Sequence, residues 1–271
     1  MSATLPLEAE PAVSAEDSAI FLRDLAVRFG PDVLAVDRTS LGIRPGEFVS
    51  FIGPSGCGKT TILNILTGLL PLQEGEAAIL GKPPRPGNPD IAYMLARDCL
   101  LPWRTVLDNA CYGMEARGVP KKEREARALG LLRDVGLGQF AHAYPKALSH
   151  GMRQRCALAR TFCLDAPVLL MDEPFGALDA QTKLQLEDVL LRLWSSQRRT
   201  VVFITHDLSE AVALSDRVIV MSPRPGRIIA DIPIDLPRPR LVRELQKNQD
   251  FHHYYARLWA LLEQGMHEDI E

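Results

Sequence analysis

The chain is predicted to adopt an α/β fold, with strands and helices alternating around a phosphate-binding loop, and two observations support this prediction. A glycine-rich octet at 53–60 stands between an apolar run at 48–52 and a helix-like run at 62–70. Two later runs, at 168–171 and 200–204, are almost uninterrupted by polar residues. Such runs are typical of central parallel strands that are covered on both faces. Strands that alternate with helices around a phosphate-binding loop form a parallel sheet.

The octet fits the pattern G-x-x-x-x-G-K-[ST] and reads Gly53-Pro54-Ser55-Gly56-Cys57-Gly58-Lys59-Thr60. Its glycines let successive backbone N–H groups turn towards a polyphosphate, and the start of the following helix adds positive potential. We expect Lys59 to reach the outer phosphates and the Thr60 hydroxyl to hold Mg²⁺, with Thr61 also among the nucleotide-binding residues. The alternative is a glycine-rich turn with an exposed lysine. The octet predicts binding of a nucleoside triphosphate.

Composition narrows the class of protein. The 271 residues are 46% hydrophobic, which is enough for a sizeable core. We therefore expect one nucleotide-binding domain with an inserted subdomain or a tail. The net charge of −3 shows no basic excess and argues against a protein that coats nucleic acid. The five cysteines are odd in number and lack C-x-x-C spacing, which indicates reduced thiols rather than a zinc site or a disulfide framework.

The sequence shows no export signal and no membrane span. Acidic residues precede the first basic residue, Arg23, so the N-terminus lacks the pattern of a signal peptide. No apolar run approaches the length of about 20 residues that a membrane-spanning helix needs. Any association with a membrane is therefore expected to come through a partner.

The N-terminal third predicts an arm followed by strands. Residues 1–19 are rich in Ala, Pro, Ser and acids, which is typical of a disordered arm. Alternating apolar and polar residues then predict strands at 25–29 and 39–43, which make up an antiparallel β portion. Pro45-Gly46 supplies a turn before the strand that leads into the octet. The proline-rich segment 81–89 is expected to be a loop.

The rest of the chain predicts one further strand and two helical regions. A strand is expected at 91–94, after the proline-rich loop. Residues 105–137 show helical spacing with a charged face, which favours a solvated helix surface over a binding patch. Prolines follow Asp231, and apolar and aromatic residues then recur at helical spacing over 241–266. This pattern predicts an amphipathic C-terminal helix within an extension at 232–271.

Two strand ends carry residues that suit phosphate chemistry. The strand at 168–171 is followed by Asp172 and Glu173. A carboxylate beside a phosphate-binding loop can hold Mg²⁺, and the next one can polarise the attacking water, so we assign Asp172 to the metal and Glu173 to the water. The alternative is an exposed acidic turn. The strand at 200–204 leads to His206, which suits a donor to the γ-phosphate, although a lone histidine is more often structural.

Five ordered motifs carry a family resemblance. They look like the Walker A, signature, Walker B, D-loop and H-loop motifs of the ATP-binding-cassette (ABC) ATPases. In that order they are the octet, Leu148 to Arg155, Met171 to Pro174, Ala177-Leu178-Asp179 and Ile204 to Asp207. The resemblance covers residues 20–231 and implies a P-loop nucleotide-binding domain of ABC type, with a helical subdomain at about 97–163.

The resemblance also implies an assembly. ABC ATPases form a head-to-tail dimer, in which the signature motif of one subunit faces the nucleotide of the other. Ser149 and the Gly151 amide would then face the γ-phosphate in trans. Asp179 is the D-loop candidate among the nucleotide-binding residues. Phe29 stands where the family places an aromatic residue against adenine, and the alternative is a plain core phenylalanine.

Two further runs, 100–106 and 221–228, look like the ATPase subunits of bacterial importers for nitrate, sulfonates and taurine. That resemblance implies two membrane permease subunits, an extracytoplasmic solute-binding protein that acts indirectly, and a second ATPase subunit. We expect this subunit to be a second copy in a homodimer, and the alternative is a different cassette. It places the chain at the cytoplasmic face of the inner membrane. It implies no nucleic-acid partner.

The sequence departs from the family at two positions. Ala96 falls where the family has the Q-loop glutamine, which is a Mg²⁺ ligand and a coupling element, and His150 replaces the first signature glycine. These departures favour an alternative, a degenerate cassette that binds ATP as a structural or regulatory subunit. The phosphate-transfer candidates Lys59, Glu173 and His206 are present, however, so we expect an active, Mg²⁺-dependent ATPase.

Overall fold

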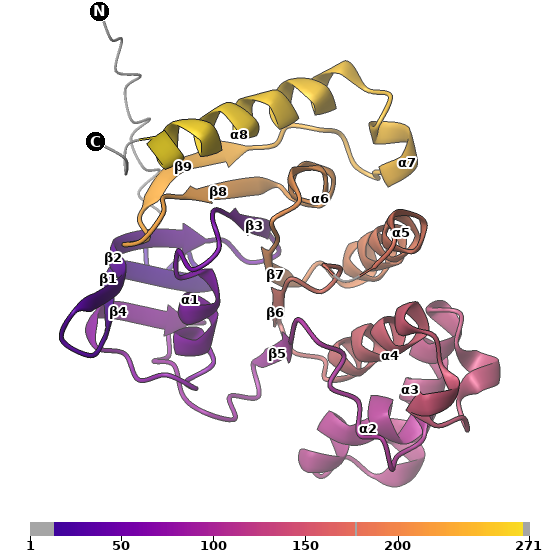
Figure 1. The fold of residues 1–271 in the computed structure, drawn as a ribbon. Helices are drawn as coiled ribbons and strands as arrows, with labels where there is room; N and C mark the ends of the chain where they lie inside the picture. The colour runs from indigo at the N-terminus through magenta and orange to yellow at the C-terminus, as the bar shows by residue number, and fades with distance from the viewer. Residues whose placement is uncertain (1–13, 177, 268–271) are drawn as a thin grey trace, which may run out of the picture. The chain divides into compact units, whose positions relative to one another are not determined.

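The computed structural model describes residues 14–176 and 178–267, and the chain divides into two compact units (Figure 1). The first unit contains the described residues up to 88 and those from 200 onwards, and the second contains residues 89–199. Most of the arm predicted at 1–19 lies outside the described residues. Within the described ranges, no helix combines the length and the apolar character that a bilayer crossing requires.

An antiparallel sheet forms one layer of the first unit. Its strands lie in the order β2 (Val33–Ile43), β1 (Ile20–Phe29) and β4 (Glu74–Ile79). Ile20 pairs with Ile43 on one side and with Ile79 on the other, and all three side chains are buried. The predicted strands are therefore parts of longer ones. The sequence pattern missed β4, because its first half is acidic and exposed and shows no alternation.

The parallel strands of the first unit position the phosphate-binding loop. β3 (Phe48–Ile52) pairs in parallel with β7 (Thr200–Ile204) and with β8 (Arg217–Met221), and β9 (Ile228–Pro233) closes this side in antiparallel pairing with β8. Every residue of β3, β7 and β8 is buried, as expected of central strands. The loop after β3 leads into α1 (Lys59–Leu66), and β7 leads towards α6 (Leu208–Leu214).

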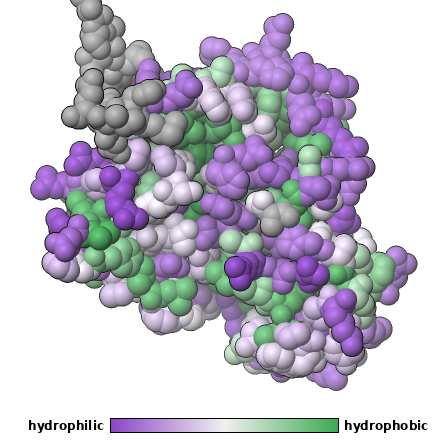
Figure 2. Space-filling view, viewed as in Figure 1, coloured by the Kyte–Doolittle hydropathy of each residue, from purple (hydrophilic) through white to green (hydrophobic). Residues whose placement is uncertain are grey.

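The C-terminal extension packs onto the first unit. The single helix predicted at 241–266 is in fact two, α7 (Val242–Leu245) and α8 (Gln249–His267). The helical conformation is interrupted between them because the Asn248 side chain accepts hydrogen bonds from the backbone N–H groups of Asp250 and Phe251 and so caps a new helix. α8 packs against α6 and β8 and buries Phe251 and Leu258. Its outer surface is mostly hydrophilic (Figure 2).

The second unit combines a strand pair with helices. β5 (Ile91–Met94) pairs in parallel with β6 (Val168–Asp172). The helical region predicted at 105–137 is divided by Gly118-Val119-Pro120 into α2 (Val106–Ala116) and α3 (Lys121–Asp134), and both pack against α4 (His150–Cys163). Two 3₁₀ turns lie between α3 and α4, at Gly138–Phe140 and Pro145–Ala147. α5 (Ala180–Gln197) completes the unit.

Candidate functional site

The loop from Gly53 to Thr60 is built around glycines and around its own lysine. Gly58 has φ +99°, and a Cβ on it would lie 2.6 Å from Val36 Cγ2, so both conformation and space require glycine there. The buried Lys59 ammonium donates hydrogen bonds to the backbone oxygens of Gly53 (2.7 Å) and Pro54 (2.9 Å). The alternative of a glycine-rich turn with an exposed lysine therefore does not hold.

The outer side of this loop is open. Ser55, Gly56 and Thr60 are exposed, whereas Cys57 and Gly58 are buried against the rest of the unit. Thr61 lies half-buried in the first turn of α1. The exposed side therefore offers backbone N–H groups, a hydroxyl and a helix start to a ligand, which is the donor set that phosphate groups require.

His206 lies at the same edge of the sheet as this loop. β7 and β3 run in parallel, and the Thr205 N–H, directly after β7, donates to the Phe51 oxygen, directly before the end of β3. The backbone on either side of His206 is held by short side chains. Thr205 Oγ1 accepts the Asp207 N–H (2.9 Å), and Asp207 Oδ1 accepts the Ser209 N–H (2.8 Å) at the start of α6. The His206 side chain itself is exposed.

Phe29 lies at the last position of β1, and its side chain is 46% exposed. A core phenylalanine is typically almost fully buried, so the alternative of a plain core residue does not hold. An exposed aromatic ring at a strand end is free to stack on a flat ligand such as a purine base.

The two adjacent acids of the second unit lie in different environments. Asp172 is the last residue of β6 and is 7% exposed, while Glu173 is only half-buried and has φ +44°. The Tyr93 hydroxyl on the neighbouring strand β5 hydrogen-bonds to the Asp172 carboxylate. Burial, together with the charge of Asp172, raises the pKa of Tyr93, so the phenol stays protonated and donates. The alternative of an exposed acidic turn is therefore wrong for Asp172.

The signature-like run forms the beginning of α4. Ser149 is the N-cap of this helix, and its hydroxyl accepts the Met152 N–H (3.3 Å). A Cβ on Gly151 would lie 2.6 Å from Thr182 Cγ2, at the start of α5, so only glycine allows this approach. Asp179 is the N-cap of α5, where hydrogen bonds from Thr182 lower the pKa of its carboxyl group. Ala177 of the D-loop-like segment lies outside the described residues.

Two supporting residues of the second unit were missed as such from the sequence. Tyr93 could have been suspected only from its place on a strand next to the acidic strand end. Gln154 is buried in α4, and its side-chain amide donates to the Pro174 oxygen, which ties the signature helix to the turn after Glu173. A glutamine within a helix gives no sequence signal for such a contact.

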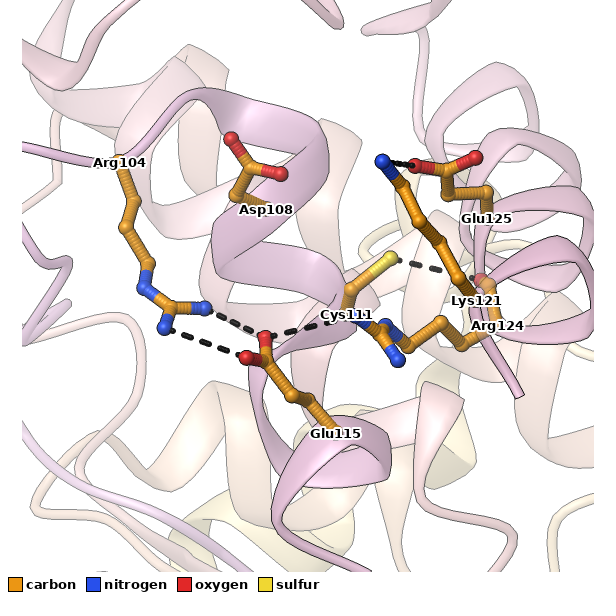
Figure 3. Close-up of a pocket in the computed structure, with 7 residues that line it drawn as sticks. All are labelled: Arg104, Asp108, Cys111, Glu115, Lys121, Arg124 and Glu125. Atoms are coloured by element: carbon orange, nitrogen blue, oxygen red, sulfur yellow. Dashed lines mark hydrogen bonds and ion pairs between the residues drawn. The ribbon is translucent and has the colours of Figure 1, made fainter. Parts of the chain in front are cut away.

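A hollow of about 290 Å³ lies between α2 and α3 in the second unit (Figure 3). All of its charged side chains except Asp108, which bonds to Thr105, are paired with one another. Arg104 contacts Glu115 at 2.6 Å, and Lys121 lies 3.7 Å from Glu125. Cys111 also lines it, and burial raises the pKa of its thiol to about 11, so the thiol is unreactive at neutral pH. This hollow contains none of the residues predicted to bind nucleotide.

Comparisons with known proteins agree with the motifs. The family described as "ABC transporter" matches residues 36–176. The taurine import ATP-binding protein TauB of Rhizobium johnstonii is 46% identical over 213 residues, which is 79% of this chain and 81% of that protein. The uncharacterized ABC transporter ATP-binding protein MJ0412 of Methanocaldococcus jannaschii is 47% identical over 211 residues, 78% and 79% of the two chains.

The fold agrees as well. The dimeric post-hydrolysis structure of the ATP-binding cassette MJ0796, bound to ADP and Pi, matches with a TM-score of 0.70 and 30% identity. The match covers 80% of this chain and 100% of that one. These findings confirm the resemblance read from the five motifs, and they give no support to a degenerate cassette. The chain belongs to the ABC transporter family, as one of its ATPase cassettes.

Proposed function

We propose that the chain is the ATP-hydrolysing subunit of an importer that takes up a small solute of the nitrate, sulfonate or taurine class. The observation that carries this proposal is the meeting of the Lys59 loop and His206 at one sheet edge. The similarity to a taurine import ATP-binding protein supports the solute class. The chain acts with separate permease subunits at the cytoplasmic face of the inner membrane, and an extracytoplasmic solute-binding protein delivers the solute.

The side chains suit the roles that this chemistry requires. Lys59 and the loop amides hold the phosphates of ATP, and Phe29 stacks on the adenine. Thr60 and Asp172 supply the hard oxygen donors that fit Mg²⁺, whose chemistry is to neutralise charge on the phosphates. Glu173, half-buried beside the buried Asp172, polarises the attacking water, and the exposed His206 donates to the γ-phosphate.

A second copy of the chain completes the working unit. Ser149 is exposed at the start of α4, and Gly151 is held there against α5. We propose that both face the nucleotide held by the partner copy, together with Asp179. The match to a cassette solved as a dimer supports this arrangement.

Replacing Glu173 by Gln tests the hydrolysis step. The amide keeps the shape of the side chain but cannot polarise water as a carboxylate does, so turnover should fall by about 10²- to 10⁴-fold while ATP binding persists. Phosphate release and fluorescent-nucleotide binding measure the two properties. Glu123→Gln, on the exposed face of α3, is the control and should hydrolyse ATP like the parent. Parent-like turnover in Glu173→Gln would show that another group activates the water.

Replacing Ser149 by Arg tests the composite site. A bulky cation at the exposed N-cap of α4 should prevent ATP-dependent dimerisation while ATP still binds to the monomer. Light scattering with and without ATP measures the mass. Ser195→Arg, near the exposed end of α5, is the control. An unchanged ATP-dependent dimer in Ser149→Arg would exclude this geometry.

A further inference from the structure

One guanidinium joins two segments of the second unit that carry the two departures from the family. Arg153 Nε donates to Asp98 Oδ2 at 3.0 Å, and Arg153 Nη2 lies 3.3 Å from His150 Nδ1. Arg153 Nη1 also donates to the Leu148 oxygen at 2.9 Å. Asp98 follows β5 and stands two residues after Ala96, while His150 is the first residue of α4. One departure, His150, therefore lies in a cluster of side chains with Asp98, which stands two residues after the other departure.

A second arginine of α4 holds the same segment. Arg160 donates to the backbone oxygens of Asp98 (2.6 Å) and Cys99 (2.8 Å). Arg160 thus fixes the backbone at 98–99 to the helix. The carboxylate of Asp98 is held separately, by Arg153 near the beginning of the helix. The Asp98 carboxylate is therefore linked to His150 through Arg153, while its other oxygen accepts the Leu100 N–H.

The geometry determines which nitrogen of His150 takes part. A guanidinium has donors only, so Nδ1 must be the acceptor and the proton of the neutral ring lies on Nε2. Within the part of the chain that the structure describes, Nε2 is buried and has no hydrogen-bond partner. Burying a donor without a partner is unfavourable, so the ring orientation is set by the Arg153 contact at Nδ1 and not by Nε2.

The exposure of the side chains in this cluster favours a role in positioning over a role in folding stability. The side chains of Arg153 and Asp98 are 32% and 20% exposed. Ion pairs with this access to water contribute little to folding stability. His150 lies between Ser149 and Gly151, two of the residues that the proposed composite site uses.

We propose that His150 is a positioning residue that couples Asp98, through Arg153, to the start of α4. In this role it orients Ser149 and the Gly151 amide for nucleotide-dependent pairing with a second copy of the chain. The inference rests on the proposed function, because the composite site gives the orientation its purpose. In this proposal, Asp98 links the 95–99 segment to the signature motif. Residue 96 cannot do so, because its side chain is only a methyl group.

Two amide variants of His150 test this directly. His150→Asn places an amide oxygen near the position of Nδ1, whereas His150→Gln places its amide near the position of Nε2. Each is made in the Glu173→Gln chain, so that ATP is not consumed, and the dimer dissociation constant with ATP is measured by analytical ultracentrifugation. We expect His150→Gln to weaken the dimer about 10-fold and His150→Asn to stay within about threefold of the parent, as loss or retention of one charged hydrogen bond implies.

Asp98→Asn provides the second arm. It should weaken the dimer about as much as His150→Gln, and combining the two should add little further, because both remove the same connection. Asp134→Asn, at the exposed end of α3, removes the same charge elsewhere and should leave the dimer unchanged. Thermal unfolding without nucleotide should be the same for all variants.

The outcomes separate this inference from the proposed function. A parent chain that stays monomeric with ATP overturns the composite site and this inference with it. The coupling through Nδ1 is wrong if the parent dimerises and both amide variants have its dimer dissociation constant. It is also wrong if His150→Gln has the dissociation constant of the parent and His150→Asn does not. A loss of thermal stability in Asp98→Asn that equals the loss of pairing would make the cluster structural and would also overturn the inference.

Discussion

At the scale of single residues, Ala96 shows what the site lacks. It is exposed and follows β5, whose residue Met94 pairs with Met171, the neighbour of Asp172. Residue 96 therefore emerges at the strand end that also carries the buried carboxylate. A methyl group cannot bind a metal, so the proposed Mg²⁺ would have to be held by the other proposed donors, Thr60 and Asp172, the latter mainly through water, and by phosphate oxygens.

Ala96→Gln should therefore strengthen metal binding. An added amide oxygen at this strand end should lower the Mg²⁺ concentration that gives half-maximal hydrolysis by about 10- to 100-fold, the usual range for gain or loss of a metal-site residue. Titrating Mg²⁺ at saturating ATP measures it. Ala96→Leu, which has similar bulk and no oxygen, is the control and should behave like the parent. A Mg²⁺ titration of Ala96→Gln that matched the parent would show that residue 96 does not approach the metal.

The sequence could nominate candidate site residues, but it could not give their environments. Spacing was enough to select Lys59, Asp172 and Glu173, because each motif is local. The hydrogen bond to Asp172 comes from Tyr93, which is distant in the sequence and adjacent only through the pairing of β5 with β6. The exposure of Phe29 likewise depends on how the antiparallel sheet ends, which no local pattern records.

At the scale of elements, the turn between β8 and β9 forms a second wall of the phosphate-binding loop. A Cβ on Gly226 would lie 1.8 Å from the Cys57 oxygen, and one on Gly53 would lie 2.8 Å from the Met221 oxygen. Gly226 also exchanges backbone hydrogen bonds with β2, donating to Ala35 and accepting from Asp37, each at 3.0 Å. The turn therefore fixes the back of the loop while its front stays open.

Gly226→Ala should disturb nucleotide binding through this wall. The added methyl group must displace Cys57 or the turn, so stability should fall by about 1–3 kcal/mol, as for other overpacked sites. ATP affinity should fall with it, because the loop amides lose their alignment. Urea unfolding and fluorescent-nucleotide titration measure the two effects. Gly130→Ala, in α3 with open space around it, is the control and should stabilise by about 0.5–1 kcal/mol. Parent-like ATP affinity in Gly226→Ala would show that the turn does not shape the loop.

The helices show which features of the elements could be predicted from sequence patterns and which could not. Helical spacing correctly predicted that 105–137 and 241–266 are helical. It did not show the breaks, although Gly118-Val119-Pro120 is a recognisable stop signal. The break at Asn248 depends on a side chain that caps the next helix, a role shared by many asparagines that lie in ordinary turns.

At the scale of the whole molecule, a buried arginine helps to fix the C-terminal extension to the rest of the first unit. Arg240 is 6% exposed and donates hydrogen bonds to the Ser215 oxygen (2.7 Å) just after α6 and to the Leu236 oxygen (2.9 Å) in the extension. Further bonds from the same guanidinium reach the oxygens of Val212, Ala213 and Ile234. α6 begins directly after His206 and Asp207, so the extension and the proposed γ-phosphate donor are supported by the same helix.

The charge on Arg240 persists at working pH. Burial lowers the pKa of its guanidinium to about 10, which is still well above neutrality. When folding lowers the pKa of a base, the free energy of unfolding rises only as pH increases from the pKa in the folded chain towards the pKa in the unfolded chain. Below about pH 9 both the folded and the unfolded chain hold the proton, so this group makes no pH-dependent contribution there.

Arg240→Met should accordingly destabilise the chain by an amount that is constant between about pH 6 and 9. The methionine fills much of the space but leaves several buried backbone oxygens without their donor, and losses of this kind cost about 3–5 kcal/mol. Urea unfolding at several pH values measures the difference from the parent. Arg243→Met, on the exposed face of α7, removes the same charge and should change stability by less than about 0.5 kcal/mol. If both variants unfolded like the parent, the extension would be held by the packing of α8 on α6 and β8 and not by this guanidinium.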